Sequence, residues 1–267
     1  MTFIGGGNMA SALISGMLKR GTPADHVQVV EPLASTRQQL IDQYGVRAIA
    51  QADDSLSGTP LVVWAIKPQL FEAVATPLQT CFPNALHLSV AAGIRTDSIA
   101  QWLGSERVVR AMPNTPALVG LGQTGLYARG AVNADERQQV EALLDAVGQS
   151  IWVPREELLD AVTAVSGSGP AYVFYVLEAM VAAGVRMGLS PEQAHQLSVG
   201  TLVGASELAR ASSEPPAVLR ERVTSKGGTT HAAITSLQQD GVAASFDKAM
   251  QAAKDRAQSL GEELGGR

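Results

Sequence analysis

The chain has 267 residues, of which 46% are hydrophobic and 17% charged, and its formal net charge is -5 at pH 7. This length suits one large or two ordinary domains, and the apolar content is ample for a sizeable core. The acidic balance, without any run of Lys or Arg, argues against a nucleic-acid partner. Cys81 is the single cysteine, so an intrachain disulfide is impossible. No signal or transit peptide is recognisable at the start, and we expect a cytoplasmic protein.

The first half of the chain alternates short β-branched runs with amphipathic stretches, which predicts a mostly parallel sheet covered by helices. A first strand ends at Phe3-Ile4, and a helix follows over 8–20. Further strands are predicted over 26–30, 61–65, 86–90 and 108–111.

The character of the sequence changes near Ile151 to Pro154, and from Glu156 onward the chain is predicted to be helical. We therefore predict a dinucleotide-binding domain over 1–154 and an all-helical domain over 155–267. Helix starts are indicated at Ser190-Pro191-Glu192 and at Pro215-Pro216. The apolar stretch 171–189 contains Glu178 and Arg186, which favours a buried helix over a membrane span. Small residues crowd this region and favour close helix packing, either between subunits or within one chain.

A glycine-rich turn stands between the first strand and the first helix. Gly5, Gly7 and Ala10 match the pattern G-x-G-x-x-A, in which the glycines allow a tight turn and a close approach to a pyrophosphate. The segment from Ile4 through Gly5, Gly6, Gly7 and Asn8 to Met9 is therefore predicted to bind a dinucleotide; a purely structural turn is the alternative.

Two features after the second strand bear on the adenosine ribose. Glu31 lies about twenty residues beyond the turn, where an acid would bind the 2′-hydroxyl of NADH. Ser35, Thr36 and Arg37 follow, and they could instead hold the 2′-phosphate of NADPH. Ser35 could equally be a helix N-cap, and Arg37 a solvated charge, so either cofactor remains open.

Four further segments carry a family resemblance, and they are 65–68 (Ala65, Ile66, Lys67, Pro68), 111–116, 166–172 and 224–230. Together with the glycine-rich turn, in this order and spacing, they resemble pyrroline-5-carboxylate reductases across essentially the whole chain. The resemblance implies a Rossmann domain joined to a helical dimerisation domain related to that of 6-phosphogluconate dehydrogenase. It also implies a homodimer, in many members assembled into a decamer, and an active site formed by both subunits.

The resemblance also assigns residues. Ala65, Ile66, Lys67 and Pro68 would lie against the cofactor, with Pro68 shaping the nicotinamide pocket. From the residues alone, Asn114 follows a strand end and offers a donor and an acceptor, so we expect it to contact the cofactor; a rigid structural turn is the alternative. The turn formed by Ser225, Gly227, Gly228, Thr229 and Thr230 would hold the carboxylate of 1-pyrroline-5-carboxylate, with Thr230 near the ring nitrogen as the catalytic residue. From the residues alone, such a turn exposes backbone amides that suit a carboxylate, although an ordinary Ser/Thr helix cap would look the same.

The sequence departs from the family pattern at two positions. Lys226 stands where most relatives have proline, and Ala52 stands where many have an asparagine that contacts adenosine. No metal-binding spacing is present, and His26, His87, His195 and His231 show no catalytic arrangement. The alternatives are another imine or hydroxyacid reductase, or a non-enzymatic regulator on the same scaffold. The helix after Gly169 lacks the lysine typical of hydroxyacid enzymes, which disfavours that alternative.

Overall fold

A computed structural model describes residues 1–265 of the chain, apart from the side chain of Asp54. The chain divides into two compact units, one comprising Met1–Pro170 with the chain from Ala252 onward, the other Ala171–Gln251. The division falls inside two helices, α7 (Gly169–Arg186) and α11 (Val242–Leu264). The domain boundary between 154 and 155 stays a sequence prediction.

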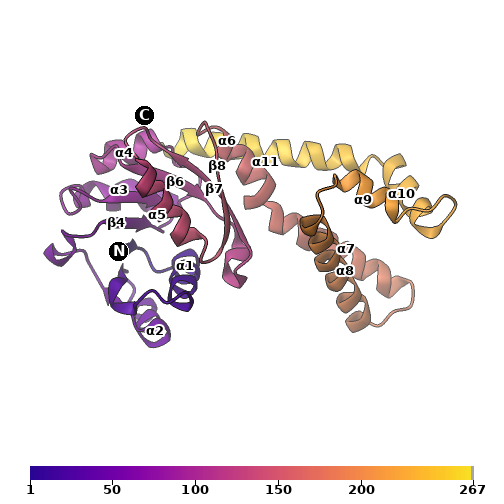
Figure 1. The fold of residues 1–267 in the computed structure, drawn as a ribbon, viewed down its shortest axis with the longest axis horizontal. Helices are drawn as coiled ribbons and strands as arrows, with labels where there is room; N and C mark the ends of the chain where they lie inside the picture. The colour runs from indigo at the N-terminus through magenta and orange to yellow at the C-terminus, as the bar shows by residue number, and fades with distance from the viewer. Residues whose placement is uncertain (266–267) are drawn as a thin grey trace. The chain divides into compact units, whose positions relative to one another are not determined.

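The first unit contains an eight-stranded sheet with the strand order β3-β2-β1-β4-β5-β6-β7-β8 (Figure 1). Strands β1 to β6 are parallel, β7 is antiparallel to β6, and β8 is parallel to β7. The first six follow the order of the Rossmann fold, which confirms the predicted mostly parallel sheet. The strands are β1 Thr2–Ile4, β2 Gln28–Val30, β3 Arg47–Ile49, β4 Leu61–Trp64, β5 Leu86–Ser89, β6 Val108–Met112, β7 Gly122–Ala128 and β8 Gly148–Trp152.

The predicted start of the second strand was wrong. His26 ends a 3-10 helix, η1 (Ala24–His26), and the strand begins only at Gln28. The reason is that Pro23 fixes an extended backbone before a short turn, which occupies the first residues of the predicted strand.

Side chains of the parallel strands alternate between two hydrophobic clusters, one on each face of the sheet. Phe3 and Val63 belong to the cluster that packs against α1 (Asn8–Lys19), whereas Ile4 and Trp64 belong to the opposite one. Figure 1 shows α1 and α2 on one side of these strands and α3 and α4 on the other. Burial on both faces explains the continuous apolar runs of the sequence. The helices of this unit include α2 Ala34–Tyr44, α3 Phe71–Ala75, α4 Thr96–Leu103 and α5 Ala134–Leu144; the 3-10 helices are η2 Asp54–Leu56, η3 Pro68–Leu70, η4 Thr76–Leu78 and η5 Thr115–Val119.

The far end of α11 completes the first unit. Leu264 packs on the second cluster, and the Ser98 hydroxyl donates to the carbonyl of Gly265 at 2.5 Å. A Cβ added at Gly93 would lie 3.3 Å from the Cβ of Leu260, so the helix runs close to the turn after β5. Residues distant in sequence therefore share one core.

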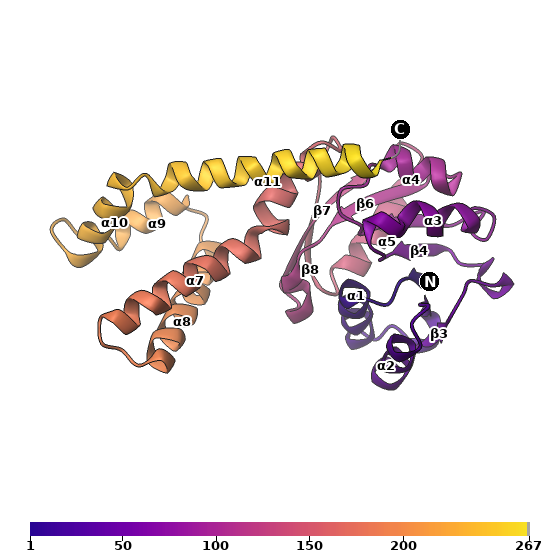
Figure 2. The same ribbon diagram turned by 180° about the vertical axis from the view of Figure 1, so that it is seen from behind.

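The rest of the chain is helical, as predicted, and the described residues after Glu156 contain no strand. Ser190 caps α8 through a reciprocal capping box with Gln193, and Pro215 is the N-cap of α9. A Cβ on Gly184 would lie 3.0 Å from the Cβ of Ala194, so α7 and α8 pack closely, as both ribbon views show (Figure 2). The elements are α6 Leu158–Val162, the π-helical turn η6 Thr163–Gly167, α7, α8 Pro191–Ala211, α9 Pro216–Arg222, α10 Thr229–Gln239 and α11.

The prediction that 171–189 forms a buried helix was wrong for the single chain. Val173, Phe174 and Tyr175 on α7 are 48%, 59% and 74% exposed. By length and composition alone, the helical stretch Leu158–Arg186 could cross a membrane: its mean hydropathy reaches 1.3 over a window that is 6% buried. No other part of the described chain covers these side chains, so a second molecule would have to bury them.

Candidate active site

The glycine-rich turn sits between the ends of three parallel strands. Gly5 has a φ of +95°, and an added Cβ would lie 2.6 Å from the carbonyl oxygen of Ala65 and 2.8 Å from Cγ2 of Ile66. Its N–H donates to the carbonyl of Val30 at 2.9 Å. Only glycine fits such a backbone conformation at such close approach. The turn is therefore held at the carboxyl ends of β1, β2 and β4, where doubly wound sheets bind ligands.

The start of α1 is open to an anion. Gly7 is the N-cap and no side chain caps the helix. A Cβ added at Gly7 would meet nothing within 4 Å, so the space beside this backbone is free. Asn8 and Met9 begin the helix and Ala10 is fully buried, which lets the helix approach the sheet. These features fit the pyrophosphate of a dinucleotide.

Glu31 connects the glycine-rich turn to the loop after β2. Its carboxylate accepts the N–H of Gly6 at Oε2 and the N–H of Leu33 at Oε1, both at 2.9 Å. The residue is 8% exposed. The structure thus places the Glu31 carboxylate against the glycine-rich turn.

Ser35 and Arg37 do not have the ordinary structural roles that the sequence left open as alternatives. The N-cap of α2 is Leu33, with no side-chain cap, so Ser35 and Thr36 lie within the first turn and Ser35 is not the cap. Arg37 is also not a freely solvated charge, because its Nη1 donates to the carbonyls of Glu31 and Pro32 at 2.8 and 2.7 Å. Thr36 lies near the glycine-rich turn, because a Cβ added at Gly6 would be 3.4 Å from its Cγ2.

Two strand-end loops continue the same edge of the sheet. Lys67 is exposed and is the N-cap of η3, with Pro68 as the first residue of that turn; Ala65 and Ile66 connect β4 to it. Asn114 follows β6, is 8% exposed, and uses both ends of its side-chain amide for bonds within the first unit.

The predicted substrate turn lies in the second unit. The N–H of Gly228 donates to the carbonyl of Ser225 at 3.0 Å, and Gly227 has a φ of +76°. Gly228 is the N-cap of α10, and no side chain caps the helix. The alternative interpretation, an ordinary Ser/Thr helix cap, is therefore wrong. The backbone N–H groups of Thr229 and Thr230, at the start of α10, have no side-chain acceptor.

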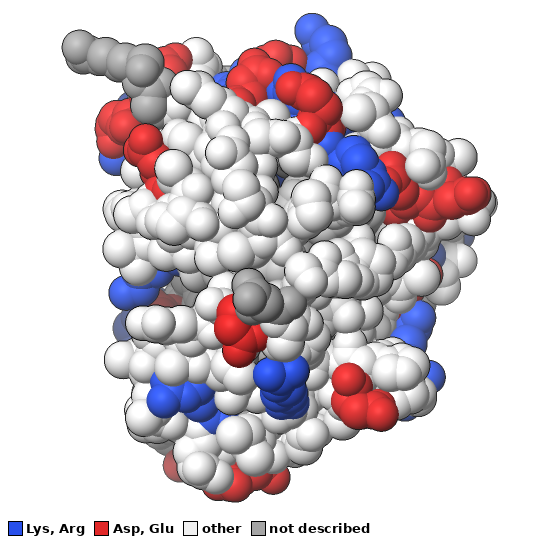
Figure 3. Space-filling view, turned by 90° about the vertical axis from the view of Figure 1, so that its left-hand side faces the viewer, with Lys and Arg blue, Asp and Glu red and all other residues white. Residues whose placement is uncertain are grey.

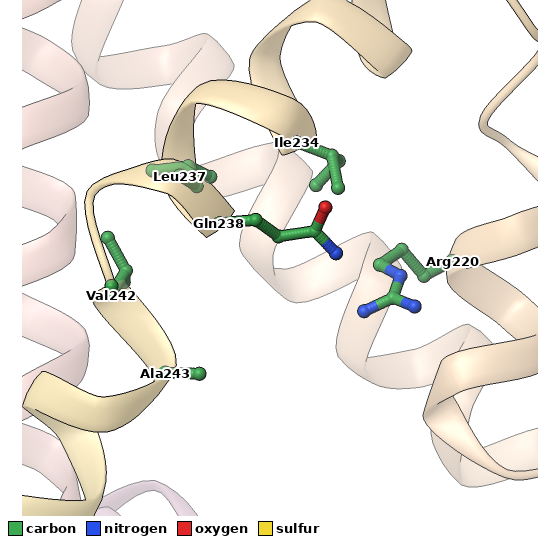
Figure 4. Close-up of a pocket in the computed structure, with 7 residues that line it drawn as sticks. Arg220, Ile234, Leu237, Gln238, Val242 and Ala243 are labelled. Carbon is green, nitrogen blue, oxygen red and sulfur yellow. The ribbon is translucent and has the colours of Figure 1, made fainter.

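A cavity of about 310 Å³ lies beside α10. Ile234, Leu237 and Gln238 project from α10 and Arg220 from α9 around it (Figure 4). An adjoining cavity of about 210 Å³ is lined in part by Thr224 and by His231, the residue after Thr230. The two cavities share Arg220, Ile234 and Gln238 and lie along α10; the first is mainly apolar, whereas the second also contains Glu221.

The histidines differ in their surroundings. His87 is buried, its Nδ1 lies 3.2 Å from Trp64 Nε1, and its pKa is lowered to about 4, mainly by burial and further by the charge of Arg107. This neutral imidazole accepts a hydrogen bond in the core, a structural role. His195 and His231 are exposed on helices. Within residues 1–265, no group of three or more His, Cys, Asp or Glu side chains is placed to hold a metal ion.

Sequence reasoning missed two buried polar groups. Arg110 is 2% exposed in the middle of β6, and a cation within an apolar strand could have indicated a buried ion pair. The hydroxyl of Tyr172, in the segment 166–172, is buried without a hydrogen-bond partner among the described residues. Nothing in the sequence distinguishes that hydroxyl from an exposed one.

Charged side chains of both signs are interspersed on the face shown in Figure 3, without a continuous basic patch on that face. A polyanion would find alternating attraction and repulsion there.

Known proteins resemble this chain over nearly its full length. A family model described as pyrroline-5-carboxylate reductase dimerisation matches residues 156–260, and one described as NADP oxidoreductase, coenzyme F420-dependent, matches residues 1–93. Pyrroline-5-carboxylate reductase of Pseudomonas aeruginosa is 43% identical over 267 residues, covering 99% of this chain and 98% of the relative. The solved reductase of Coxiella burnetii is 36% identical with a TM-score of 0.92, covering 97% of both chains. That of Plasmodium falciparum, solved with NADP bound, is 27% identical with a TM-score of 0.87, again covering 97% of both. The chain belongs to the pyrroline-5-carboxylate reductase family.

Proposed function

We propose that this protein reduces 1-pyrroline-5-carboxylate to L-proline with NADPH or NADH, the last step of proline biosynthesis. The observation that carries this proposal is the 43% identity to a curated reductase across almost the entire chain. The predicted alternatives, a hydroxyacid reductase or a non-enzymatic regulator, have no comparable support.

The first unit would hold the cofactor. Gly5, Gly6 and Gly7 would place the pyrophosphate at the open start of α1, while Glu31 and Arg37 would face the adenosine ribose. When bound, the reduced nicotinamide supplies the hydride that reduces the C=N bond. Lys67 and Pro68 would border the nicotinamide end of the site, because they follow β4 at the same edge of the sheet.

The turn before α10 would hold the substrate. Its carboxylate would accept hydrogen bonds from the uncapped amides after Gly228, supported by the Ser225 and Thr229 hydroxyls. The Thr230 hydroxyl would orient the ring nitrogen, which carries a proton from solvent in the reactive iminium form. The contribution of these residues is then mainly alignment, which can supply several kcal/mol.

The test is the loss of reduced-nicotinamide absorbance with 1-pyrroline-5-carboxylate. We expect rapid imine-dependent turnover without any protein partner, and a fall in kcat/KM of about a hundredfold in Thr230→Ala with cofactor affinity intact. Ser236→Ala, at an exposed position on the same helix, is the matched control. Absence of turnover with both cofactors would overturn the activity, and a normal kcat/KM in Thr230→Ala would overturn the residue assignment.

Self-association follows from the family, since residues 156–260 match a dimerisation model. We propose that a second copy covers the exposed apolar face of α7, and that dimers assemble further into a decamer in the cytoplasm. Sedimentation analysis distinguishes these states as multiples of the 27.9 kDa chain.

A further inference from the structure

The backbone carbonyl of Ser166 lacks the donor that a regular α-helix would give it. In an α-helix the donor would be the N–H four residues later, and that residue is Pro170, which has no N–H. The chain reaches α7 through the π-helical turn η6, in which the N–H of Ser168 donates to the carbonyl of Thr163 at 2.8 Å. Such turns occur often at functional sites.

The side chain of Asn114 supplies the missing donor. Its Nδ2 donates to the carbonyl of Ser166 at 3.0 Å, and its Oδ1 accepts the N–H of Gln123 at 2.9 Å. Because one end faces a carbonyl and the other an N–H, only one orientation of the amide satisfies both contacts. Asn114 thus ties β7 to the turn before α7, with the residue 8% exposed.

This tether lies at the carboxyl end of β6. Strands β1, β4 and β6 are parallel, so their carboxyl ends share the edge that carries the glycine-rich turn and Lys67. A Cβ added at Gly167 would lie 2.6 Å from Cε of Met112, the last residue of β6, so the π-turn packs directly against that strand end. The first residues of α7 are therefore held at the cofactor edge of the sheet.

We infer that Asn114 is a positioning residue, which fixes the start of α7 against the nicotinamide end of the site by replacing the donor that Pro170 lacks. The inference rests on the proposed reductase function. The sequence predicted that Asn114 binds the cofactor; here its amide acts through Ser166 and Gln123 instead. Loss of the tether moves the start of α7 without removing a cofactor contact.

The experiment compares Asn114→Ala, Pro170→Ala and the double variant with the wild type. Asn114→Ala lowers kcat about tenfold or more, while the dissociation constant for NADPH, measured by fluorescence without substrate, stays within about twofold. Pro170→Ala restores a backbone N–H four residues after Ser166, so it recovers part of the lost kcat in the double variant and has little effect alone. Asn114→Asp, which still accepts from Gln123 but cannot donate to Ser166, loses at least as much as Asn114→Ala.

Two results would overturn the inference. One is a tenfold rise in the NADPH dissociation constant of Asn114→Ala, which would make the amide a cofactor ligand. The other is a double variant no better than Asn114→Ala, which would mean that the donor to Ser166 is not what matters. Cofactor binding is measured without substrate, so it stays interpretable even if the wild type fails to reduce the imine. That failure would count against the proposed function alone.

Discussion

Nη1 of Arg110 lies 2.9 Å from Oε1 of Glu156, an ion pair in which Arg110 is 2% and Glu156 10% exposed. The same carboxylate accepts the N–H and the hydroxyl of Thr96 at 2.8 and 2.6 Å. It therefore joins β6, the start of α4 and the segment before α6, while Asp160 pairs with Arg95 at 3.0 Å. Removal of Glu156 therefore takes away the nearer acidic partner of the buried Arg110 guanidinium and leaves only Asp160, whose Oδ1 lies 4.0 Å from Nη2 of Arg110.

Glu156→Ala should lower the free energy of unfolding by about 3–5 kcal/mol, as expected for breaking a buried pair. The control is Asp97→Ala, which removes an 88% exposed partner of Arg129 and should cost less than about 1 kcal/mol. Guanidinium unfolding followed by circular dichroism measures both. Equal losses would show that the Arg110 network is no more important than a surface pair.

His87 predicts a loss of stability in acid. Its pKa is about 4 in the folded protein, against 6.5 for the free side chain, because burial disfavours the imidazolium. As the pH falls below about 6.5, the His87 side chain becomes protonated in the unfolded chain, whereas in the folded chain it stays neutral until about pH 4. Stability should fall by about 3 kcal/mol over that range. In His87→Gln this part of the pH dependence disappears, whereas His195→Gln, at an exposed position on α8, retains it.

Glu31 and Arg37 should set the cofactor ratio in opposite directions. The carboxylate of Glu31 opposes a 2′-phosphate, so Glu31→Gln should raise the ratio of kcat/KM for NADPH over NADH about tenfold. Arg37→Ala should lower that ratio, because the proposed site places its guanidinium, bonded to the Glu31 carbonyl, near the same ribose. Gln38→Ala, whose exposed side chain bonds to Asp42, serves as control. A ratio that stays constant in both variants would place the adenosine ribose elsewhere.

Phe174 tests the apolar face of α7. The side chain is 59% exposed in the single chain, and a charge there opposes burial against a second copy. Phe174→Glu should sediment at the 27.9 kDa of one chain, whereas Ile41→Glu, at an exposed apolar position on α2, should sediment like the wild type. A Phe174→Glu protein of unchanged size would rule out α7 as the contact.

Lys226 occupies the second position of the Ser225–Gly228 turn, and Gly227, at the third position, has a positive φ. Turns of this geometry favour proline at the second position. The exposed ammonium should attract an anionic substrate weakly. Lys226→Gln should therefore raise the KM for the imine about threefold at low salt and less at high salt, with kcat constant. Lys226→Pro should raise the KM by the same factor if the charge of Lys226, rather than its backbone N–H, attracts the substrate. An unaffected KM would mean that the ammonium points away from the substrate.

Patterns that depend on local backbone geometry could be predicted from the sequence. Glycine at Gly5, the apolar run 61–65 and the helix start at Ser190 each reflect one local requirement, and the structure contains all three. Strands β3, β7 and β8 escaped prediction. Arg47 is exposed on β3, β7 contains two glycines and polar side chains, and β8 is an edge strand. Pairing with a neighbouring strand, which composition does not encode, makes these segments strands.

The role of Asn114 shows the same limit within the site. Its sequence motif indicated a functional loop, but the partner of its amide is the carbonyl of Ser166, 52 residues away, whose regular α-helical donor is replaced by Pro170. Exposure of α7 was likewise unpredictable, because an apolar helix has the same composition whether its own chain or a second copy covers it.

The return of α11 to the first unit has a consequence for synthesis. Gly93 contacts Leu260, and Ser98 contacts Gly265. The surface around Gly93 and Ser98 is therefore covered only after more than 150 further residues have been synthesised. At typical elongation rates that delay is on the order of ten seconds. The nucleotide-binding unit thus emerges with one side of its core uncovered, and α11 covers that side only after the intervening residues have been made.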